Sequence, residues 1–285
     1  MSAAILLFGA NGQVGSELHA VLSAARQTVI ALDRSHVDMR DPSAIRAAIN
    51  THRPAVILNA TAYTAVDQAE TDADTAHAVN VVAPAAMAES AASLGALLVH
   101  YSTDYVFDGT LDRPYRESDP TNPQSVYGRT KLAGEDAIRS TGARHLIFRT
   151  SWVFGVHGGN FVKTMLKLAA ERPELRVVAD QVGAPTSARH IAQATARIIA
   201  RPSIPSGTFH MTASGAVSWH GFAREIVTRA GKNIPVHPIT TLEFPRPAAR
   251  PANSRLDNRL LGETFNESLP PWQQGLAECM AVLRV

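Results

Sequence analysis

Tyr127 and Lys131 stand four residues apart in a stretch with a helical pattern. Side chains at this spacing share one face of a helix. A nearby cation favours the phenolate and lowers the pKa of a tyrosine from about 10, which makes the phenol a usable proton donor near neutral pH. The hydroxyl of Thr103 could bind the carbonyl oxygen that receives this proton. We therefore take these three residues as candidate catalytic residues for chemistry on a carbonyl group.

A glycine-rich segment near the start of the sequence predicts where a second reactant binds. Gly9, Gly12 and Gly15 follow an apolar run and open a helical pattern. Glycines in this context let the backbone turn tightly and approach a pyrophosphate, whose charge the helix N-terminus attracts. No Gly-Lys-Ser/Thr sequence follows, which argues against a mononucleotide loop. We expect a dinucleotide here, and a reduced nicotinamide would supply the hydride that ketone reduction needs.

The residues after the second apolar run bear on the type of cofactor. Asp33 ends this run, and a carboxylate there can accept hydrogen bonds from the adenosine ribose, which favours NADH. Arg34 and Ser35 come next and could instead hold the 2′-phosphate of NADPH. The choice between NADPH and NADH therefore stays open. Asp38 and Met39 are expected near the adenine.

The elements that position these residues follow an alternating pattern in the first half of the chain. Strands are predicted at residues 4–8, 28–32, 55–60, 97–102 and 145–150, and helices at 13–26, 42–52, 72–94 and 125–140. The strands are almost continuously apolar, which indicates burial on both faces, as in a parallel sheet. The prediction is an α/β fold with a Rossmann-type doubly wound parallel sheet. Such sheets bind ligands at the carboxyl ends of their strands, where Thr103 and the helix of Tyr127 also lie.

The second half of the chain has a looser pattern with frequent prolines. Helices are still predicted at 160–170 and 188–200, and no low-complexity linker separates the halves. We expect residues 1–151 to form an NAD(P)-binding Rossmann domain. Residues 152–285 are expected to form a smaller, mainly substrate-binding subdomain, with some elements returning to the sheet.

Composition limits the classes of partner. Hydrophobic residues make up 45% of the 285 residues, so the chain can bury a core. The net charge of +2 is too small to argue for nucleic acid, and no apolar run approaches the ~20 residues of a membrane span. The single cysteine, Cys279, excludes an intramolecular disulfide, and the apolar start lacks the basic region of a signal peptide. We expect a cytoplasmic protein without nucleic-acid or membrane partners.

Longer stretches of the sequence form a recognisable series. They are residues 9–15, 59–67, 100–107, 127–135, 148–153, 180–186 and 250–256. The Ser-Thr-Asp-Tyr-Val-Phe stretch at 102–107 and the Arg-Pro-Ala-Asn-Ser-Arg stretch at 250–255 are the specific ones. Together they resemble the extended short-chain dehydrogenase/reductases and, within these, the dTDP-4-dehydrorhamnose reductase family, in that family's order along the chain.

The resemblance implies an activity. It is the NAD(P)H-dependent reduction of the C4 ketone of dTDP-4-dehydro-L-rhamnose to dTDP-L-rhamnose, the last step in making this sugar donor for cell-surface polysaccharide. Tyr127 would protonate the oxygen, Lys131 would tune Tyr127 and bind the nicotinamide ribose, and Thr103 would polarise the carbonyl. The substrate partner would be a small nucleotide sugar.

The resemblance also implies binding residues. The cofactor set is Gly9, Asn11, Gly12, Gln13, Val14, Asp33, Arg34, Asp38, Met39, Ala60, Ala62, Tyr63, Thr64, Tyr127 and Lys131. The substrate set is Thr103, Asp104, Val106, Trp152, Asn160, Gln181, Arg250, Asn253 and Arg255. Within the second set, Arg250 and Arg255 are expected to bind the diphosphate through paired N–H groups.

One departure from the family concerns a metal. Some members dimerise through Mg²⁺ held by carboxylates on the first helix and on the segment after residues 183–186. Glu17 matches the first position, but Arg189 stands at the second, and Mg²⁺ requires oxygen ligands. We therefore expect no metal site, regard Mg²⁺ as doubtful here, and leave a homodimer as an open alternative.

Four alternative functions follow from the same residues. A 4,6-dehydratase would carry a glutamate after Asp104, and Tyr105 stands there instead, so elimination lacks its base. A reductase for another nucleotide-linked 4-keto-deoxysugar, or a 4-epimerase, needs the same tyrosine and lysine and stays open. A non-catalytic NADP-binding regulatory subunit, like that of methionine adenosyltransferase, would not need an intact proton donor. The presence of Tyr127, Lys131 and Thr103 together favours an enzyme.

Overall fold

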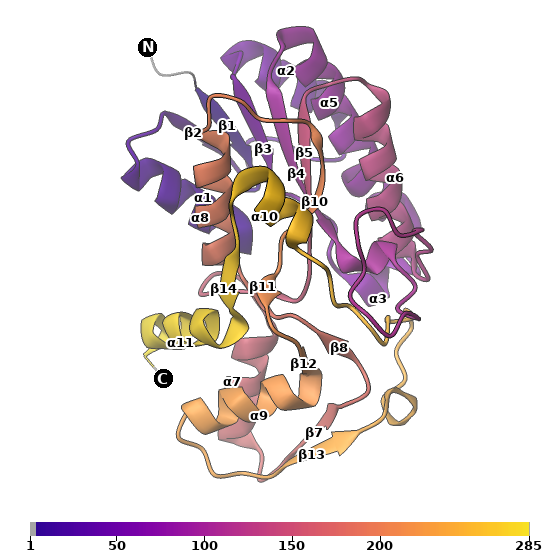
Figure 1. Ribbon diagram of the computed structural model, residues 1–285. Helices are drawn as coiled ribbons and strands as arrows, with labels where there is room; N and C mark the ends of the chain where they lie inside the picture. The colour runs from indigo at the N-terminus through magenta and orange to yellow at the C-terminus, as the bar shows by residue number, and fades with distance from the viewer. Residues whose placement is uncertain (1–3, 285) are drawn as a thin grey trace.

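A six-stranded parallel sheet runs through the upper part of the molecule in Figure 1, a computed structural model that describes residues 4–284. Its strands are β1 Ile5–Phe8, β2 Val29–Leu32, β3 Val56–Asn59, β4 Leu97–Thr103, β5 His145–Thr150 and β10 Gly207–His210. They lie in the order β10-β5-β4-β3-β1-β2. The chain winds in opposite directions from β1 and β3, which confirms the predicted doubly wound fold and places the ligand crevice between these two strands.

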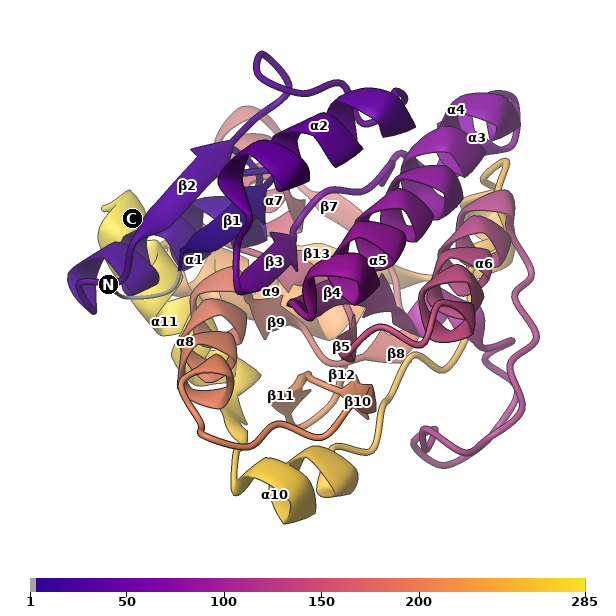
Figure 2. The same cartoon turned by 90° about the horizontal axis from the view of Figure 1, so that it is seen from above.

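Helices cover both faces of the sheet, as the view from above in Figure 2 shows. On one face lie α1 Gln13–Ala24 and α8 Ala188–Ile199, and on the other α2 Pro42–His52, α5 Ala83–Leu94 and α6 Val126–Ser140. The apolar residues of β1 alternate between two cores. Leu6 and Phe8 pack with α2 and α5, whereas Ile5 and Leu7 pack with α1 and α8. This two-sided burial explains the continuous apolar runs of the sequence.

The helix predicted over 72–94 is interrupted by a wider turn. It consists of α4 Ala73–His77, a π-helical turn η1 Ala78–Val82, and α5. Pro84 has no N–H group, so the carbonyl of Asn80 cannot accept the usual α-helical hydrogen bond from it. The side chain of Asn80 accepts a hydrogen bond from the N–H of Tyr63 at 2.9 Å and donates to the hydroxyl of Thr130 at 3.1 Å. The turn thus ties the loop after β3 to α6.

The rest of the second half forms a smaller layer below the sheet in Figure 1. Its core joins α7 Phe161–Glu171, α9 Trp219–Arg229 and α11 Trp272–Leu283 around Phe154, Phe222 and Trp272. The remaining elements are α3 Val66–Ala69, η2 Asp104–Val106, β6 Val153–Phe154, β7 Leu175–Val178, β8 Val182–Gly183, β9 Thr186–Ser187, β11 Ala213–Ser214, β12 Val217–Ser218, β13 Val236–Ile239, η3 Thr241–Glu243, α10 Arg259–Phe265 and β14 Leu269–Pro271. The predicted domain ranges 1–151 and 152–285 include residues 1–3 and 285, which lie outside the described residues.

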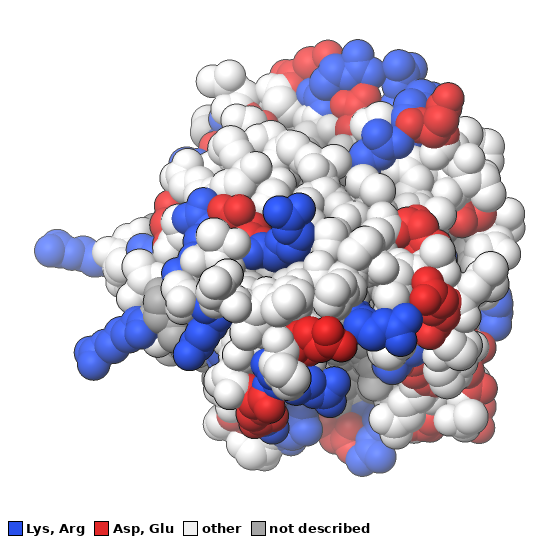
Figure 3. All heavy atoms as spheres, turned by 90° about the horizontal axis from the view of Figure 1, so that it is seen from below, with Lys and Arg blue, Asp and Glu red and all other residues white. Residues whose placement is uncertain are grey.

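Charged side chains of both signs are interspersed on the face shown in Figure 3. Blue and red side chains alternate there without forming a broad patch of one sign. Between residues 4 and 284, none of the helices combines the length and the apolar character that a membrane span requires.

Replacing Gly134 on α6 by alanine tests how closely this helix packs on the π turn. A Cβ atom at Gly134 would lie 2.1 Å from the backbone oxygen of Asn80, which is far inside contact distance. We expect Gly134→Ala to lower the free energy of unfolding by about 1–3 kcal/mol in urea denaturation, despite the higher helix propensity of alanine. Gly159→Ala is the control, since its Cβ would meet no atom within 4 Å. Equal stabilities of the Gly134 variant and the wild type would contradict this packing.

Candidate active site

The first cavity opens at the carboxyl ends of β1, β2 and β3 and has a volume of about 640 Å³. Gly9 has a φ of +82°, and a Cβ atom there would lie 2.8 Å from the Ala60 carbonyl oxygen, so only glycine fits. Gly12 caps the N-terminus of α1 without a side chain, which leaves the first N–H groups of this helix open to a ligand. A Cβ at Gly15 would lie 2.0 Å from the Gly9 carbonyl oxygen. The loop has the form that a pyrophosphate requires.

The first cavity gathers most of the residues predicted for the cofactor. Those that line it are Gly9, Asn11, Gly12, Asp33, Arg34, Asp38, Met39, Ala60, Ala62 and Tyr63. Gln13, Val14, Thr64, Tyr127 and Lys131 lie outside its lining. Sequence reasoning missed Leu32, Val37, Arg40, Thr61, Thr75 and Val79. Thr75 and Val79 belong to α4 and the π turn, whose approach to the glycine loop has no signal in the local sequence.

Acidic groups at the far end of the first cavity are held by local hydrogen bonds. Asp33 accepts hydrogen bonds from the Asn11 amide at 2.5 Å and from the N–H and hydroxyl of Ser35 at 2.9 and 2.6 Å. The Ser35 hydroxyl, with His36 beside it, lowers the pKa of the Asp33 carboxyl. Asp38 instead forms an ion pair with Arg40 at 2.7 Å. Asp33 is therefore the carboxylate fixed against the glycine loop.

Tyr127 lies in the first turn of α6, which Ser125 caps by accepting a hydrogen bond from the Gly128 N–H at 3.1 Å. The Tyr127 ring meets the ring of Tyr105 edge to face, with centroids 5.5 Å apart. Burial raises the pKa of Tyr127 to about 12, with the Thr103 hydroxyl opposing and the Asp104 charge adding to the rise. The structure thus brings Tyr127, Thr103 and Asp104 together at the end of β4.

Lys131 takes a different position from the one expected. It is 1% exposed, and its Nζ donates to the Tyr101 carbonyl oxygen at 2.7 Å and lies 3.0 Å from Nε2 of His100, rather than contacting Tyr127. The predicted lowering of the Tyr127 pKa by Lys131 is therefore wrong for this arrangement. Burial in turn lowers the pKa of Lys131 to about 8, against the charge of Glu135. Sequence reasoning missed His100, which the spacing of Tyr127 and Lys131 does not reveal.

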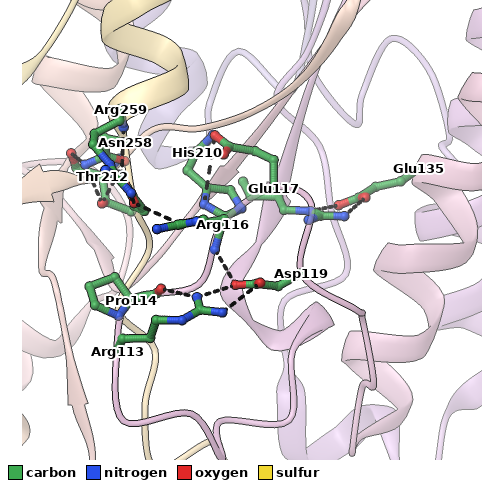
Figure 4. Close-up of polar contacts among 12 residues, drawn as sticks. Arg113, Pro114, Arg116, Glu117, Asp119, Glu135, His210, Thr212, Asn258 and Arg259 are labelled. Carbon is green, nitrogen blue, oxygen red and sulfur yellow. Dashed lines mark hydrogen bonds and ion pairs between the residues drawn. The ribbon is translucent and has the colours of Figure 1, made fainter.

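A buried ion pair holds α6 against the sheet. Glu135 accepts hydrogen bonds from Nε and Nη2 of Arg149 on β5, at 2.9 and 2.7 Å, and from the Ser102 hydroxyl on β4 at 2.5 Å. Figure 4 shows Glu135 in this network, and Glu117 accepting a hydrogen bond from the His210 N–H at 2.7 Å. Since Glu135 lies two turns beyond Tyr127, these bonds fix the helix that carries the phenol.

A second cavity of about 750 Å³ lies between α7, β7 and the segment 239–250. Four arginines join an apolar lining there, namely Arg172, Arg176, Arg246 and Arg250. The predicted substrate residues Gln181 and Arg250 are among the residues that line it. Both guanidinium ends of Arg250 bond to the carboxylate of Asp67 at 2.9 Å, and Arg246 reaches the same carboxylate at 2.5 Å. This pairing joins the second cavity to α3, beside the first.

Two other predicted substrate residues contact a residue of the second cavity and a residue of the glycine loop, respectively. Trp152 stacks on Trp219 with centroids 3.5 Å apart and planes 8° from parallel, and its backbone has a φ of +48°. Trp219 itself lines the second cavity. Asn160 caps α7 and donates to the side chain of Gln13 at 3.0 Å, so it meets the glycine loop. Positive φ is costly for a tryptophan, which indicates that the surrounding packing fixes this ring.

The remaining predicted substrate residues have structural partners. Val106 is 0% exposed in a core with Phe107, Tyr115 and Leu256, and its predicted contact with substrate stays a prediction. The amide of Asn253 donates to the carbonyl oxygens of Leu111 and Arg113 at 2.7 and 2.8 Å. Arg255 donates to Asn253 Oδ1 at 2.8 Å and to the Asp112 carbonyl oxygen. Asn253 and Arg255 hold the loop after η2, and the expected contact of Arg255 with the diphosphate stays a prediction.

The sequence as a whole matches the family model described as RmlD substrate binding domain over residues 3–285. A dTDP-4-dehydrorhamnose reductase of Burkholderia thailandensis is 46% identical over 292 residues, which cover 97% of each chain. The chain belongs to the dTDP-4-dehydrorhamnose reductase family.

Solved structures of this reductase family have the same fold. The dTDP-4-dehydrorhamnose reductase of Clostridium acetobutylicum has a TM-score of 0.95 and 41% identity, covering 99% of this chain and 100% of its own. The dTDP-4-dehydrorhamnose reductase of Bacillus anthracis, solved in complex with NADP, has a TM-score of 0.95 and 35% identity over the same shares. Among solved members of the family, one therefore holds a nicotinamide cofactor in this fold.

The residues that some family members use for Mg²⁺ lie on α1 and at the start of α8. Glu17 is buried on α1, near Cys279 of α11, and Arg189 is exposed on α8. Within residues 4–284, no group of three or more His, Cys, Asp or Glu side chains is placed to hold a metal ion. The expectation about Mg²⁺ stays a prediction.

The burial of Asp104 gives a test of this site by pH. Burial raises the pKa of Asp104 to about 6, although the hydroxyls of Ser254 and Thr103 oppose the rise. A folded-state pKa above the ordinary 3.8 means that the folded protein binds this proton more tightly, so the contribution of Asp104 to stability falls as the pH rises from about 4 to 6. We expect Asp104→Asn to be more stable than wild type by about 1–3 kcal/mol at about pH 8, with a smaller difference near pH 5, in urea unfolding.

The matched control is Asp112→Asn, which changes an exposed carboxylate in the same region. Its stability difference from wild type should not vary between the two pH values. If Asp104→Asn behaved like this control, Asp104 would not be buried as an ionisable group.

Proposed function

We propose that the protein reduces the C4 ketone of dTDP-4-dehydro-L-rhamnose to dTDP-L-rhamnose with NADPH or NADH, the last step of dTDP-rhamnose biosynthesis. The observation that carries the proposal is the meeting of Thr103, Asp104 and Tyr127 at the carboxyl end of β4, the same edge of the sheet at which the dinucleotide cavity opens. The names and near-complete coverage of the relatives support it.

The cofactor would occupy the first cavity. The residues fit, because the glycine loop leaves free N–H groups for the pyrophosphate, and Asp33 and Arg34 stand where an adenosine ribose or its phosphate would bind. The cofactor supplies hydride to C4 of the sugar. We propose residues 1–151 as the mainly cofactor-binding part and 152–285 as the mainly substrate-binding part, with β10 and α8 returning to the sheet layer.

The nucleotide end of the substrate would occupy the second cavity. Its apolar lining suits a base, and Arg246 and Arg250 already hold one carboxylate, Asp67, in the paired geometry that a diphosphate also accepts. Oδ2 of Asp104 is buried and has no hydrogen-bond partner within residues 4–284, so it is available to accept from a sugar hydroxyl. The stacked ring of Trp152 would border the sugar.

Proton donation falls to Tyr127. A phenol whose pKa is raised to about 12 keeps its proton at neutral pH, which is the form that donates to the developing alkoxide. Tyr127 would give its phenolic proton to the substrate's carbonyl oxygen as that oxygen becomes an alkoxide, and the Thr103 hydroxyl would stabilise the negative charge on it. Lys131 holds this end of α6 through the Tyr101 carbonyl and is proposed to bind the nicotinamide ribose.

The setting of the reaction completes the proposal. We place it in the cytoplasm, with a small nucleotide sugar as partner and without nucleic acid. A homodimer would need an interface other than one through Mg²⁺, because Arg189 stands at the second ligand position.

Substituting Tyr127 by phenylalanine tests the reaction and its proton donor together. With dTDP-4-dehydro-L-rhamnose generated in situ, wild type should consume NADPH or NADH, followed by the loss of reduced-nicotinamide absorbance. Tyr127→Phe should lower kcat by about 10²–10⁴-fold, because the proton donor is lost, while cofactor affinity stays close to wild type. Tyr101→Phe is the control, since it removes a hydroxyl bonded to Thr195 at 2.9 Å. A cofactor-binding wild type that consumes neither nucleotide would overturn the proposed substrate.

Substituting Asp33 by alanine tests the adenosine end. Loss of this carboxylate removes repulsion of a 2′-phosphate and an acceptor for the ribose hydroxyls. We expect the ratio of kcat/KM for NADPH to that for NADH to rise by about tenfold in Asp33→Ala. Asp74→Ala, an exposed change outside the first cavity, should keep the wild-type ratio. An unchanged ratio in the Asp33 variant would mean that this residue does not face the ribose.

A further inference from the structure

Asn59, His100 and Lys131 form a buried chain that connects β3, β4 and α6. Nδ2 of Asn59 lies 3.0 Å from Nδ1 of His100, and Nε2 of His100 lies 3.0 Å from Nζ of Lys131. Asn59 and His100 are 0% exposed. Burial holds the pKa of His100 well below its ordinary value, so the imidazole is neutral. A neutral imidazole has one N–H donor and one acceptor nitrogen, and the direction of the chain depends on which is which.

The contacts of Asn59 determine which nitrogen of His100 donates and which accepts. Oδ1 of Asn59 accepts hydrogen bonds from the N–H of Thr61 at 3.0 Å and from its hydroxyl at 2.6 Å. A backbone N–H can only donate, so the amide oxygen must face Thr61 and the amide nitrogen must face His100. The amide nitrogen also only donates. Nδ1 of His100 is therefore the acceptor, and the ring proton lies on Nε2.

The last link of the chain is a donor that points at Lys131. The N–H at Nε2 of His100 faces Nζ of Lys131, and Nζ donates in turn to the carbonyl oxygen of Tyr101 at 2.7 Å. An ammonium group has no lone pair and would meet this N–H as a second donor, whereas a neutral amine has a lone pair to accept it. Every donor in this series therefore has an acceptor only when Lys131 is a neutral amine.

We propose that Asn59 and His100 are positioning residues that stabilise the uncharged amine of Lys131 in the cofactor-free protein, and that cofactor binding shifts Lys131 towards its protonated form. The phosphates and ribose hydroxyls of a dinucleotide bring negative charge and acceptor oxygens to this edge of the sheet, and both favour an ammonium. The second half of the proposal rests on the proposed role of Lys131 at the nicotinamide ribose.

Other charged groups near Lys131 are accounted for by their own partners. Glu135 on α6 favours the ammonium, but its carboxylate is bound by Arg149 of β5 and by Ser102. Glu70, after α3, accepts from the Val126 N–H at the start of α6 at 2.8 Å. The groups that face this end of α6 are His100 on β4, Arg149 on β5, Asp104 on η2, Glu70, and Tyr127 and Glu135 on α6 itself.

The charge of Lys131 can be read by NMR of protein labelled with ¹³C and ¹⁵N in lysine. The chain has four lysines, so the spectrum is simple, and Lys131→Arg assigns the signal. In cofactor-free wild type the Lys131 signal should titrate at a lower pH than a free lysine amine. In Asn59→Leu the midpoint should rise by about 1 pH unit, because His100 can then move its proton to Nδ1 and accept from the ammonium with Nε2. Saturating NADPH should raise the midpoint of the wild-type Lys131 titration.

Asn80→Leu is the matched control. Asn80 is also buried and bonds to α6 through the Thr130 hydroxyl at 3.1 Å, yet it lies outside the hydrogen-bonded series of Asn59, His100 and Lys131. Its variant should keep the wild-type midpoint. A midpoint that falls or stays unchanged in Asn59→Leu would overturn the proposal, because Asn59 would then be accepting from Nδ1 of His100.

A second measurement covers the case in which Asn59→Leu does not fold. The ¹⁵N shifts of the His100 ring in wild-type protein, assigned with His100→Gln, should show a protonated Nε2 and a bare Nδ1. The reverse tautomer would overturn the proposal. The lysine titration of Asn59→Leu and the measurement of the His100 tautomer both use cofactor-free protein and need no turnover. Their outcomes therefore do not depend on whether the protein carries out the proposed reduction.

Discussion

The bond between Glu135 and Arg149 is the interaction on which the site depends. Both side chains are buried, and the carboxylate is bound twice by the guanidinium and once by Ser102. A buried ion pair costs much of its attraction in desolvation, so its main effect here is to fix geometry rather than to add stability. It locks α6 to β4 and β5 in one position. The phenol of Tyr127, two turns earlier on the same helix, is placed by that lock.

The polar groups of the site are held in unfavourable surroundings. Asp104 is buried with an oxygen that lacks a partner within residues 4–284, and the ring of Tyr127 is buried beside it. Each would be more stable in water, so folding must offset the cost of their burial through the apolar cores on both faces of the sheet. Burial also strengthens the electrostatic interactions of these groups with a ligand, because the protein interior screens charge weakly. The same environment keeps the Tyr127 proton in place.

The wall of the second cavity is held by charge at α3. Asp67 on α3 binds Arg246 and Arg250, which lie more than half the chain away in the sequence, and its pKa is lowered to about 2, chiefly by Arg250. This contact fixes the wall of the second cavity relative to the loop that follows β3. A ligand phosphate in that cavity would compete with Asp67 for the same N–H groups.

The sequence by itself determined the elements and the chemistry that local spacing encodes. The glycine loop, the apolar strands and the Tyr127–Lys131 helix are set by periodicity and by covalent neighbours, and each was predictable because a residue's face on a helix or strand follows from its position. Tertiary structure decided which side chains meet across long separations. It placed Lys131 next to His100 and buried Val106. It also bonded Asn253 and Arg255 to the loop after η2 and widened the helix at Asn80. These outcomes depend on how finished elements pack, and no local pattern contains that information.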